Sequence, residues 1–479
     1  MLQIANSMNV NLFRLNDDIK RFPQVHPITA DMHQTREGIS RLVMLDRYSF
    51  KDSMKMTLKD GDFVVVTVKD DEKYPSKGLG KILQIDRARN KAMILVEEEF
   101  RGPLKDEEAE KGIIERGMND FEKPLEIYYE QICHRVARGL AEPEQNEAKR
   151  KEDERLFYEA LASNAFVPAG RVLYGAGSGT QVTYFNCYVM PFIKDSREGI
   201  SDHRKMVMEI MSRGGGVGTN GSTLRPKHAR ARGVNGRSSG SVSWLNDIAT
   251  LTHLVEQGGS RRGAQMLMMA DWAPDIVEFI VSKMQNPDIL RYLLRTIKNE
   301  FIKEHIQRKL TFNPLTDSEK RMHEQIVALN GRFDEEQVRS SEQILEDGGT
   351  YDVINKEFLS GANISVTITN DFMDAVKNDE DFHLRFPDIE NYSKQEMKDY
   401  NEMWSEVGDV REWERMGYGI KTYQTLPAKE LWNLINTCAT YSAEPGIFYI
   451  DNANDMTNAS AYGHKVVATN PCGKEFASR

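Results

Sequence analysis

Runs of apolar residues divide the chain into a short β-rich region followed by a long region in which strands and helices alternate. Phe63–Val68 follows a glycine turn, and Lys81–Ile85 and Ala92–Val96 flank a polar turn. Short apolar runs separated by a polar turn are typical of a β-hairpin. We therefore expect a small β module at residues 61–105, after an N-terminal segment, residues 1–60, to which the pattern assigns no element.

The region that follows has helical periodicity. An acidic stretch at Glu97–Glu110 resembles a linker, and apolar residues then recur at helical spacing between residues 120 and 164. Recurrence at every third or fourth position is the pattern of an amphipathic helix. We expect a helical domain at residues 106–180.

From residue 181 to residue 479 the pattern is that of an α/β domain. The pattern predicts strands at Tyr184–Met190, at the short apolar run Met266–Met269, at Ala362–Thr369, where apolar and polar residues alternate, and at Gly446–Asp451. Helices are expected between them: one capped by Ser201–Asp202, one over Val242–Val255 and one from Pro427 to Cys438. A polar, mostly helical insertion occupies about residues 285–350. Strands that alternate with helices imply a mainly parallel sheet or barrel.

Composition narrows the class of protein. Charged residues make up 28% and hydrophobic residues 40% of the 479 positions, which is ordinary for a globular protein. The net charge of -10 argues against a broad nucleic-acid surface, although a local basic loop can still bind a nucleotide. No apolar run approaches the ~20 residues that span a bilayer, and the N-terminus lacks a signal-peptide pattern. We expect no membrane and no nucleic-acid partner.

The cysteines are scattered, without a CxxC pair or metal-type spacing, at Cys133, Cys187, Cys438 and Cys472. This usage fits a reducing cytoplasm and predicts no metal site. Cys133 and Cys438 lie on helical apolar stripes and are interpreted as packing residues. Cys472 differs, because Pro471 and Gly473 disfavour regular structure on both sides. An exposed loop thiol is a candidate for chemistry, against the alternative of an incidental surface cysteine.

Three glycine-rich stretches are candidates for ligand contact. Gly214–Asn220 closes a helix, so it is either a helix cap with a tight turn or a backbone segment that approaches a ligand. Arg225–Gly240 and Gly258–Ala264 combine glycine with arginine, whose guanidinium binds phosphate in a bidentate geometry. The alternative is a pair of solvated basic loops. Two such loops separated by one helix favour a nucleotide.

Together these segments resemble one family, the large catalytic subunit of ribonucleotide reductase, over about residues 120–473. The segments that carry the resemblance are Asn186–Cys187, Gly214–Asn220, Gln257–Gly263, Asn363–Val366, Glu444–Ile447 and Thr469–Gly473. Phe166–Gly177 and the β module resemble the class II branch, which depends on adenosylcobalamin. A class I large subunit is the alternative.

The resemblance implies the N-terminal half of a ten-stranded α/β barrel with a central finger loop. It implies that a thiyl radical on Cys472 abstracts the 3′ hydrogen of a ribonucleoside di- or triphosphate and that Cys187 supplies reducing electrons. Asn470 would bind the substrate hydroxyls. The implied substrate-binding residues are Asn186, Cys187, Gly216, Asn470, Pro471, Cys472 and Gly473.

The resemblance also implies an allosteric site for a deoxynucleoside triphosphate or ATP. Asp195 would contact the effector sugar, Arg225 and Arg232 its phosphates, and the second loop would relay effector identity. The residues of that loop are Gly258, Gly259, Arg261 and Arg262. A thioredoxin-like protein would reduce the disulfide left by turnover.

One residue departs from the family pattern. The position after Gly473 carries a glutamate that acts as general base in the family, and here it is Lys474. An ammonium does not accept a proton at neutral pH unless its pKa is strongly depressed. We expect a truncated reductase that is inactive alone. The alternatives are one half of a split enzyme completed by a second chain, and a non-catalytic nucleotide-binding regulatory remnant.

Overall fold

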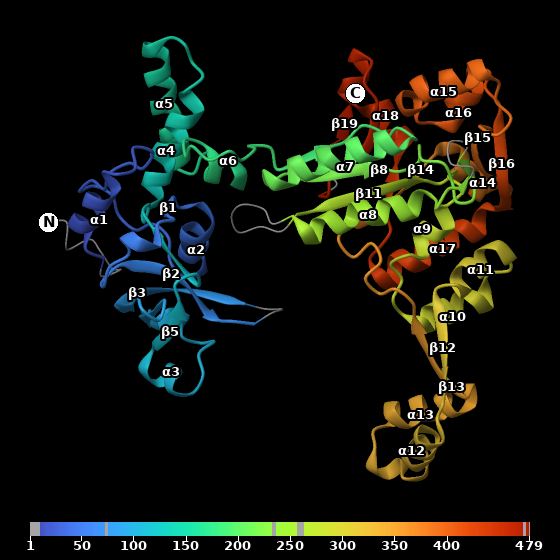
Figure 1. Ribbon diagram of the computed structural model, residues 1–479, viewed down its shortest axis with the longest axis horizontal. Helices are drawn as coiled ribbons and strands as arrows, with labels where there is room; N and C mark the ends of the chain where they lie inside the picture. Colours follow the sequence, from blue (N-terminus) through green and yellow to red (C-terminus); the bar gives the residue numbers. More distant parts are fainter. Residues whose placement is uncertain (1–9, 72–74, 232–235, 256–262, 473–475, 479) are drawn as a thin grey trace. The chain divides into compact units, whose positions relative to one another are not determined.

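The computed structural model describes residues 10–71, 75–231, 236–255, 263–472 and 476–478. The chain forms an N-terminal unit that ends at Asn186 and a C-terminal unit that begins at Cys187. Each unit has its own hydrophobic core. The N-terminal unit is blue to teal and the C-terminal unit green to red in Figure 1.

The N-terminal unit is built around an antiparallel six-stranded sheet with the order β1-β6-β2-β3-β4-β5. Its strands are β1 (Lys51–Asp52), β2 (Phe63–Lys69), β3 (Ser76–Asp86), β4 (Lys91–Val96), β5 (Ile113–Gly117) and β6 (Phe121–Pro124). The three strands predicted from apolar runs beside turns are confirmed as β2, β3 and β4. The sheet takes strands from both sides of residue 105, so the β structure extends beyond the predicted hairpin.

The helices of this unit are α1 (Leu12–Ile19), α2 (Gly38–Val43), α3 (Asp106–Lys111), α4 (Tyr129–Ala141), α5 (Glu147–Ala162) and α6 (Gly170–Gly175). Single turns of 3₁₀ or π helix lie at Met44–Tyr48, Lys55–Thr57 and Glu98–Phe100. The helical pattern expected from residue 120 was wrong at its start, because residues 121–124 form β6, which pairs with β1 and β2, and the first long helix begins at Tyr129. Cross-strand pairing overrode the local periodicity there.

A buried ion pair joins the sheet side of this unit to its helices. Arg135 of α4 and Glu126 are both fully buried, with Arg135 Nε 2.7 Å from Glu126 Oε1 and Nη2 3.0 Å from Oε2. The same guanidinium donates to the carbonyls of Tyr48 at 3.0 Å, Leu173 at 3.0 Å and Ala176 at 2.8 Å. A buried charge is tolerated only when its hydrogen-bonding groups have partners. The Arg135 guanidinium meets this condition.

The C-terminal unit contains a parallel five-stranded sheet with the order β17-β14-β11-β8-β7, of which Figure 1 labels β8, β11 and β14. The strands are β7 (Cys187–Val189), β8 (Gly216–Asn220), β11 (Gln265–Ala270), β14 (Asn363–Ile368) and β17 (Gly446–Tyr449). The expected alternation of strands and helices around a parallel sheet is confirmed. The ten-stranded barrel stays a prediction.

The remaining strands of this unit form two-stranded ladders. They are β9 (Arg230–Ala231) with β10 (Gly236–Arg237), β12 (Leu310–Pro314) with β13 (Gly349–Val353), β15 (Asp381–Pro387) with β16 (Ile420–Pro427), and β18 (Val466–Thr469) with β19 (Phe476–Ser478). The last ladder precedes and follows Cys472.

The helices of the C-terminal unit outside the predicted insertion lie between its strands. They are α7 (Arg197–Ser212), α8 (Ser241–Leu254), α9 (Ile276–Val281), α14 (Asn370–Asn378), α15 (Lys394–Val407), α16 (Val410–Arg415), α17 (Ala428–Ser442) and α18 (Ile450–Met456). The predicted insertion contains α10 (Pro287–Thr296), α11 (Glu300–Gln307), α12 (Asp317–Ala328) and α13 (Glu335–Asp347). Turns of 3₁₀ helix lie at Asn330–Arg332 and Asn458–Tyr462.

The predicted cap of α7 was wrong. Ser196, not Ser201, caps this helix, since the Ser196 hydroxyl accepts a hydrogen bond from the Gly199 amide at 2.9 Å. Both serines precede an apolar stripe, so spacing alone did not distinguish them. The true cap lies one turn earlier, directly after the segment that carries Asp195.

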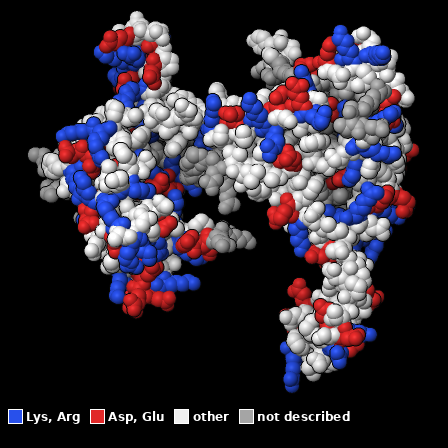
Figure 2. All heavy atoms as spheres, viewed as in Figure 1, with Lys and Arg blue, Asp and Glu red and all other residues white. Residues whose placement is uncertain are grey.

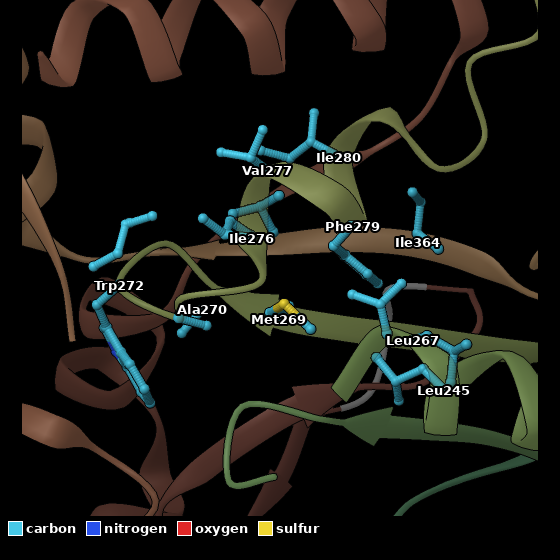
Figure 3. Packing of buried hydrophobic residues seen from close by; sticks show 14 of the residues in the cluster. Leu245, Leu267, Met269, Ala270, Trp272, Ile276, Val277, Phe279, Ile280 and Ile364 are labelled. Carbon is cyan, nitrogen blue, oxygen red and sulfur yellow. The ribbon is translucent and has the colours of Figure 1, made fainter. Parts of the chain in front are cut away.

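Strand β11 is buried on both faces, and its alternate residues serve two different contacts. Leu267 and Met269 pack against the helices on one side, next to Leu245 of α8 and Phe279 of α9 (Figure 3). The other face carries two methionines that cluster with Val467 and Ala468 of β18, and these are Met266 and Met268. Continuous burial of this kind is expected of a parallel strand. The second face therefore supports the segment that leads to Cys472.

A buried histidine joins α7 to β8 and makes stability depend on pH. His203 is 1% exposed, and its Nε2 lies 3.0 Å from Thr219 Oγ1. Burial lowers the pKa of His203 to about 4 from its usual 6.5. A lowered folded-state pKa contributes stability that is fully present above pH 6.5 and is lost as pH falls toward 4.

The free energy of unfolding should fall by about 3 kcal/mol between pH 7 and pH 4 because of His203, which is the equivalent of its pKa shift. We predict that His203→Gln removes this decrease. Urea unfolding of the C-terminal unit between pH 7 and pH 4 measures it. The exposed His464→Gln is the control. An unchanged pH slope in His203→Gln would show that this imidazole does not titrate on unfolding.

Acidic and basic side chains are interspersed over the visible faces of both units (Figure 2). Among the helices that the structure describes, none has the length and apolar character needed to cross a membrane.

Candidate functional site

Strands β7 and β8 bring a thiol and a bare stretch of backbone together. Cys187 pairs with Gly216 in the parallel register. A β-carbon on Gly216 would lie 3.2 Å from the Cys187 sulfur and 3.1 Å from Cγ of Pro471. Cys187 and Pro471, which are far apart in the sequence, therefore both lie beside Gly216. A side chain larger than glycine at position 216 would crowd the Cys187 thiol and the loop that contains Pro471.

Strand β18 crosses β8 at a second glycine. A β-carbon on Gly218 would lie 1.8 Å from the carbonyl oxygen of Thr469 and 3.3 Å from Cα of Asn470. Real β-carbons do not approach a backbone atom that closely. The sequence Gly216-Val217-Gly218 thus explains how the chain before Cys472 lies directly against the sheet, with Val217 directed into the core on the other side.

We predict that Gly218→Ala displaces β18 and costs about 1–3 kcal/mol, the usual range for overpacking a filled site. The thermal midpoint of the C-terminal unit should fall, and Cys472 should react with a thiol reagent at a changed rate. Gly331→Ala is the control, because a β-carbon there meets no atom within 4 Å. Equal melting and equal thiol reactivity in the two variants would contradict the close approach of β18 to β8.

The end of β18 presents one buried amide and one exposed thiol. Asn470 is 3% exposed, whereas Cys472 is exposed, as its proline and glycine neighbours predict. Cys187 is buried at 8% exposure. A polar side chain and two thiols at one end of a sheet can bind a polar ligand and carry out sulfur redox chemistry.

The structure places the other predicted substrate residues unequally. Asn186 directly precedes Cys187 and is the last residue of the N-terminal unit, so its substrate contact stays a prediction. Gly473 and the adjacent Lys474 lie outside the described residues. The same holds for the predicted effector residues Arg232, Gly258, Gly259, Arg261 and Arg262.

The two remaining cysteines are packing residues, as the helical pattern predicted. Cys133 lies in the core of the N-terminal unit, and Cys438 of α17 lies in the core of the C-terminal unit. Burial raises the pKa of both thiols to about 12. Both therefore stay protonated and poorly nucleophilic at neutral pH.

A second candidate site lies at the start of α7. Asp195 and Arg225, the two described effector residues, line a cavity of about 420 Å³. This volume is within the range of small-molecule sites. Two further arginines of the cavity, Arg197 and Arg237, have no carboxylate partner among the described ion pairs. A cavity lined by several arginines suits an anion such as a phosphate.

Asp195 is held in place by internal partners. One of its oxygens accepts from the Arg225 backbone amide at 3.1 Å, and the other from Arg225 Nε at 2.8 Å and the Tyr400 hydroxyl at 2.7 Å. Burial, followed by the Asp195 charge, holds the pKa of Tyr400 well above its usual value, so this hydroxyl remains a donor. A sugar hydroxyl that binds Asp195 would share an oxygen already engaged by these groups.

Sequence reasoning missed Tyr400. It lies on α15, and its partner Asp195 is 205 positions away, so no local pattern connects the two. Trp244 of α8 and Asn401 of α15 also line the cavity and were not singled out. Arg237, in contrast, belongs to the basic glycine-rich stretch that sequence reasoning singled out.

Within the part of the chain that the structure describes, no group of three or more His, Cys, Asp or Glu side chains is arranged to hold a metal ion.

Two family models match the chain. The ribonucleotide reductase barrel domain matches residues 185–478, and the ribonucleotide reductase all-alpha domain matches residues 116–181. The first match includes β7, β8 and the Thr469–Cys472 segment. The second includes helices α4, α5 and α6.

Individual relatives agree with the family models. A vitamin B12-dependent ribonucleoside-diphosphate reductase of Thermoplasma acidophilum is 26% identical over 320 residues, 67% of this chain and 28% of the relative. The ribonucleoside-diphosphate reductase large chain of Cryptosporidium parvum is 25% identical over 318 residues, which are 66% of this chain and 30% of the relative. A vitamin B12-dependent ribonucleoside-diphosphate reductase of Mycobacterium tuberculosis is 33% identical over 134 residues, which are 28% of this chain and 19% of the relative. The chain thus spans less than a third of the length of these relatives.

Proposed function

Because the chain belongs to the large-subunit family of ribonucleotide reductases, we propose that it supplies the thiyl-bearing part of an enzyme that reduces ribonucleotides to deoxyribonucleotides. The observation that carries this proposal is the meeting of Cys187, Gly216 and Pro471, directly before the exposed Cys472. The match covers 28% of the Thermoplasma relative. We therefore assign turnover to a complete enzyme that also contains the rest of the barrel, in the same protein or in a second chain.

Each residue has a defined role in this reaction. A Cys472 thiyl radical takes the 3′ hydrogen, which breaks a C–H bond and forms an S–H bond. The 2′ hydroxyl then leaves as water with one added proton. Cys187 and a second thiol give two electrons and two protons as they form a disulfide, and Cys472 returns its hydrogen to C3′. The balance is ribonucleotide plus dithiol to deoxyribonucleotide, water and disulfide.

The surroundings of the site suit this chemistry. Asn470 is buried, so its amide can hold the sugar hydroxyls with little competition from water. The second thiol of the disulfide pair is not Cys133 or Cys438, which are buried in the two cores. We assign it to the remaining part of the barrel. A thioredoxin-like reductant would reopen the disulfide, and the four free cysteines suit a reducing cytoplasm.

Adenosylcobalamin fits as the radical source, because exposure of Cys472 allows a bulky cofactor to approach its thiol. When bound, this cofactor supplies an organic radical by homolysis of its cobalt–carbon bond. Two of the relatives above are named as vitamin B12-dependent. A class I large subunit is the second candidate, favoured by the similarity to the Cryptosporidium chain.

The proposal is tested by mixing the purified chain with the remaining barrel region of the Thermoplasma relative, adenosylcobalamin, a dithiol and a ribonucleoside di- or triphosphate. Deoxyribonucleotide should form in the mixture and not with either part alone. Product from this chain by itself would contradict the division of the site. A chain that binds nucleotides while every complemented mixture stays inactive would support a regulatory remnant instead.

We predict that the cavity at Asp195 binds deoxynucleoside triphosphates and that Arg237→Ala weakens their binding by about 10- to 100-fold, the effect of losing one charged hydrogen bond. Calorimetric titration of the full chain measures the affinity. Arg213→Ala is the control, because this exposed arginine pairs with Glu209 and does not line the cavity. Equal affinity of both variants would remove Arg237 from the phosphate site.

A further inference from the structure

Strand β18 lies on the five-stranded sheet without belonging to its backbone ladder. Its described pairing is to β19 alone, through Val466 with Ser478 and Thr469 with Phe476. A two-stranded ladder of this length is marginal in water. Other contacts must therefore fix the position of β18 along the sheet. Hydrogen bonds between side chains and the β18 backbone provide these contacts.

Asn454 of α18 binds both backbone groups of the first residue of β18. Its Nδ2 donates to the Val466 carbonyl at 3.0 Å, and its Oδ1 accepts from the Val466 amide at 2.8 Å. A carboxamide has the same donor and acceptor as a peptide group, so this side chain replaces a neighbouring strand.

Asn220, at the end of β8, binds the next residue. Its Nδ2 donates to the Val467 carbonyl at 2.8 Å. Its Oδ1 accepts from the amide and the hydroxyl of Ser222 at 3.0 and 2.6 Å, which orients the carboxamide. Asn220 is 3% exposed, so the bond to Val467 is shielded from water.

Met268 of β11 provides the third contact. The Thr469 amide donates to Met268 Sδ at 3.2 Å, and the Thr469 hydroxyl lies 3.8 Å from the same sulfur. A thioether is a weak acceptor, but both partners are fully buried. Loss of an acceptor in such a place leaves an amide unsatisfied, which costs more than an average hydrogen bond contributes.

We propose that Asn454, Asn220 and Met268 are positioning residues. They fix the position of β18 along the sheet and therefore the positions of Asn470 and Cys472, which follow it. The three side chains hold backbone groups of Val466, Val467 and Thr469, and Cys472 follows Thr469 three residues later. A slip of one residue would move the thiol by about 3.3 Å and turn it to the other face. The consequence for catalysis rests on the proposed function, whereas the restraint on β18 does not.

The test uses hydrogen–deuterium exchange of the full chain, read on peptides that cover residues 464–472. Asn454→Ala should raise exchange there at least about 10-fold, and the nearly isosteric Met268→Leu several-fold. The controls are Asn452→Ala, an exposed asparagine of the same helix, and Met269→Leu, on the opposite face of the same strand. Peptides from β11 and β14 should exchange at the wild-type rate in all four variants.

Unchanged exchange over residues 464–472, or an increase spread equally over β8, β11 and β14, would overturn the proposal. If Asn454→Ala does not fold, Met268→Leu against Met269→Leu decides, because both substitutions conserve volume. In the complemented enzyme, Met268→Leu should lower kcat with little change in KM. Exchange needs no turnover, so an inactive enzyme with the expected exchange pattern would count against the proposed reductase activity and not against the positioning role.

Discussion

Replacing Cys472 with serine should abolish deoxyribonucleotide formation by the complemented enzyme, with a loss of at least about 10⁴-fold, the scale seen when an essential covalent group is removed. A serine hydroxyl has a far stronger bond to hydrogen than a thiol, so it cannot carry the radical. The side chains are similar in size and Cys472 is exposed, so stability should change little. Product formation in single-turnover experiments measures the loss.

Two matched variants separate this effect from general damage. Cys438→Ala removes a buried thiol of the α17 core and should lower stability while keeping turnover within about twofold of the wild type once folded. Cys187→Ser should also abolish turnover with a dithiol, because the reducing pair is broken. Substantial activity of Cys472→Ser would remove this residue from the reaction.

Replacing Arg135 with methionine should destabilise the N-terminal unit by about 3–5 kcal/mol, the cost of leaving a buried charge without its partner. Glu126 is 0% exposed and would keep only the Phe50 amide, at 2.7 Å, and lose both bonds to the guanidinium. The carbonyls of Tyr48, Leu173 and Ala176 would lose their donor as well. Chemical unfolding, monitored by hydrogen–deuterium exchange of peptides from α4, measures the change in stability.

Arg150→Met on α5 is the control for Arg135→Met. This exposed arginine has no side-chain ion pair among the described contacts, so its replacement should change stability by less than about 0.5 kcal/mol. Arg135→Met combined with Glu126→Gln should recover part of the loss, because it removes the buried charge. Equal stability of Arg135→Met and Arg150→Met would show that the Arg135–Glu126 ion pair does not stabilise the N-terminal unit.

The fold could be predicted where local pattern and tertiary environment agree. Strand β11 is apolar throughout after Gln265, as burial on two faces of a parallel sheet requires, and β14 alternates between apolar and small polar residues. Residues 121–124 were misassigned because their pairing with β1 and β2 has no signature within the segment itself.

The candidate site was predictable from its residue types and not from its geometry. Cys187, Gly216 and Cys472 were singled out from motifs, but the need for glycine at position 218 appears only when Thr469 is seen to cross it. Tyr400 and Met268 act on partners about 200 positions away, at 205 and 201 residues respectively. Contacts of this kind depend on the folded arrangement, so single-sequence reasoning did not reach them.

In the proposed reaction, Cys472 carries an unpaired electron during turnover. The most direct test is electron paramagnetic resonance of the complemented enzyme, frozen during turnover, with the chain made from cysteine deuterated at Cβ. A radical centred on the Cys472 sulfur couples to those hydrogens, so deuteration should narrow its signal, and Cys472→Ser should abolish it. A radical signal that is unaffected by the label and persists in Cys472→Ser would contradict the account.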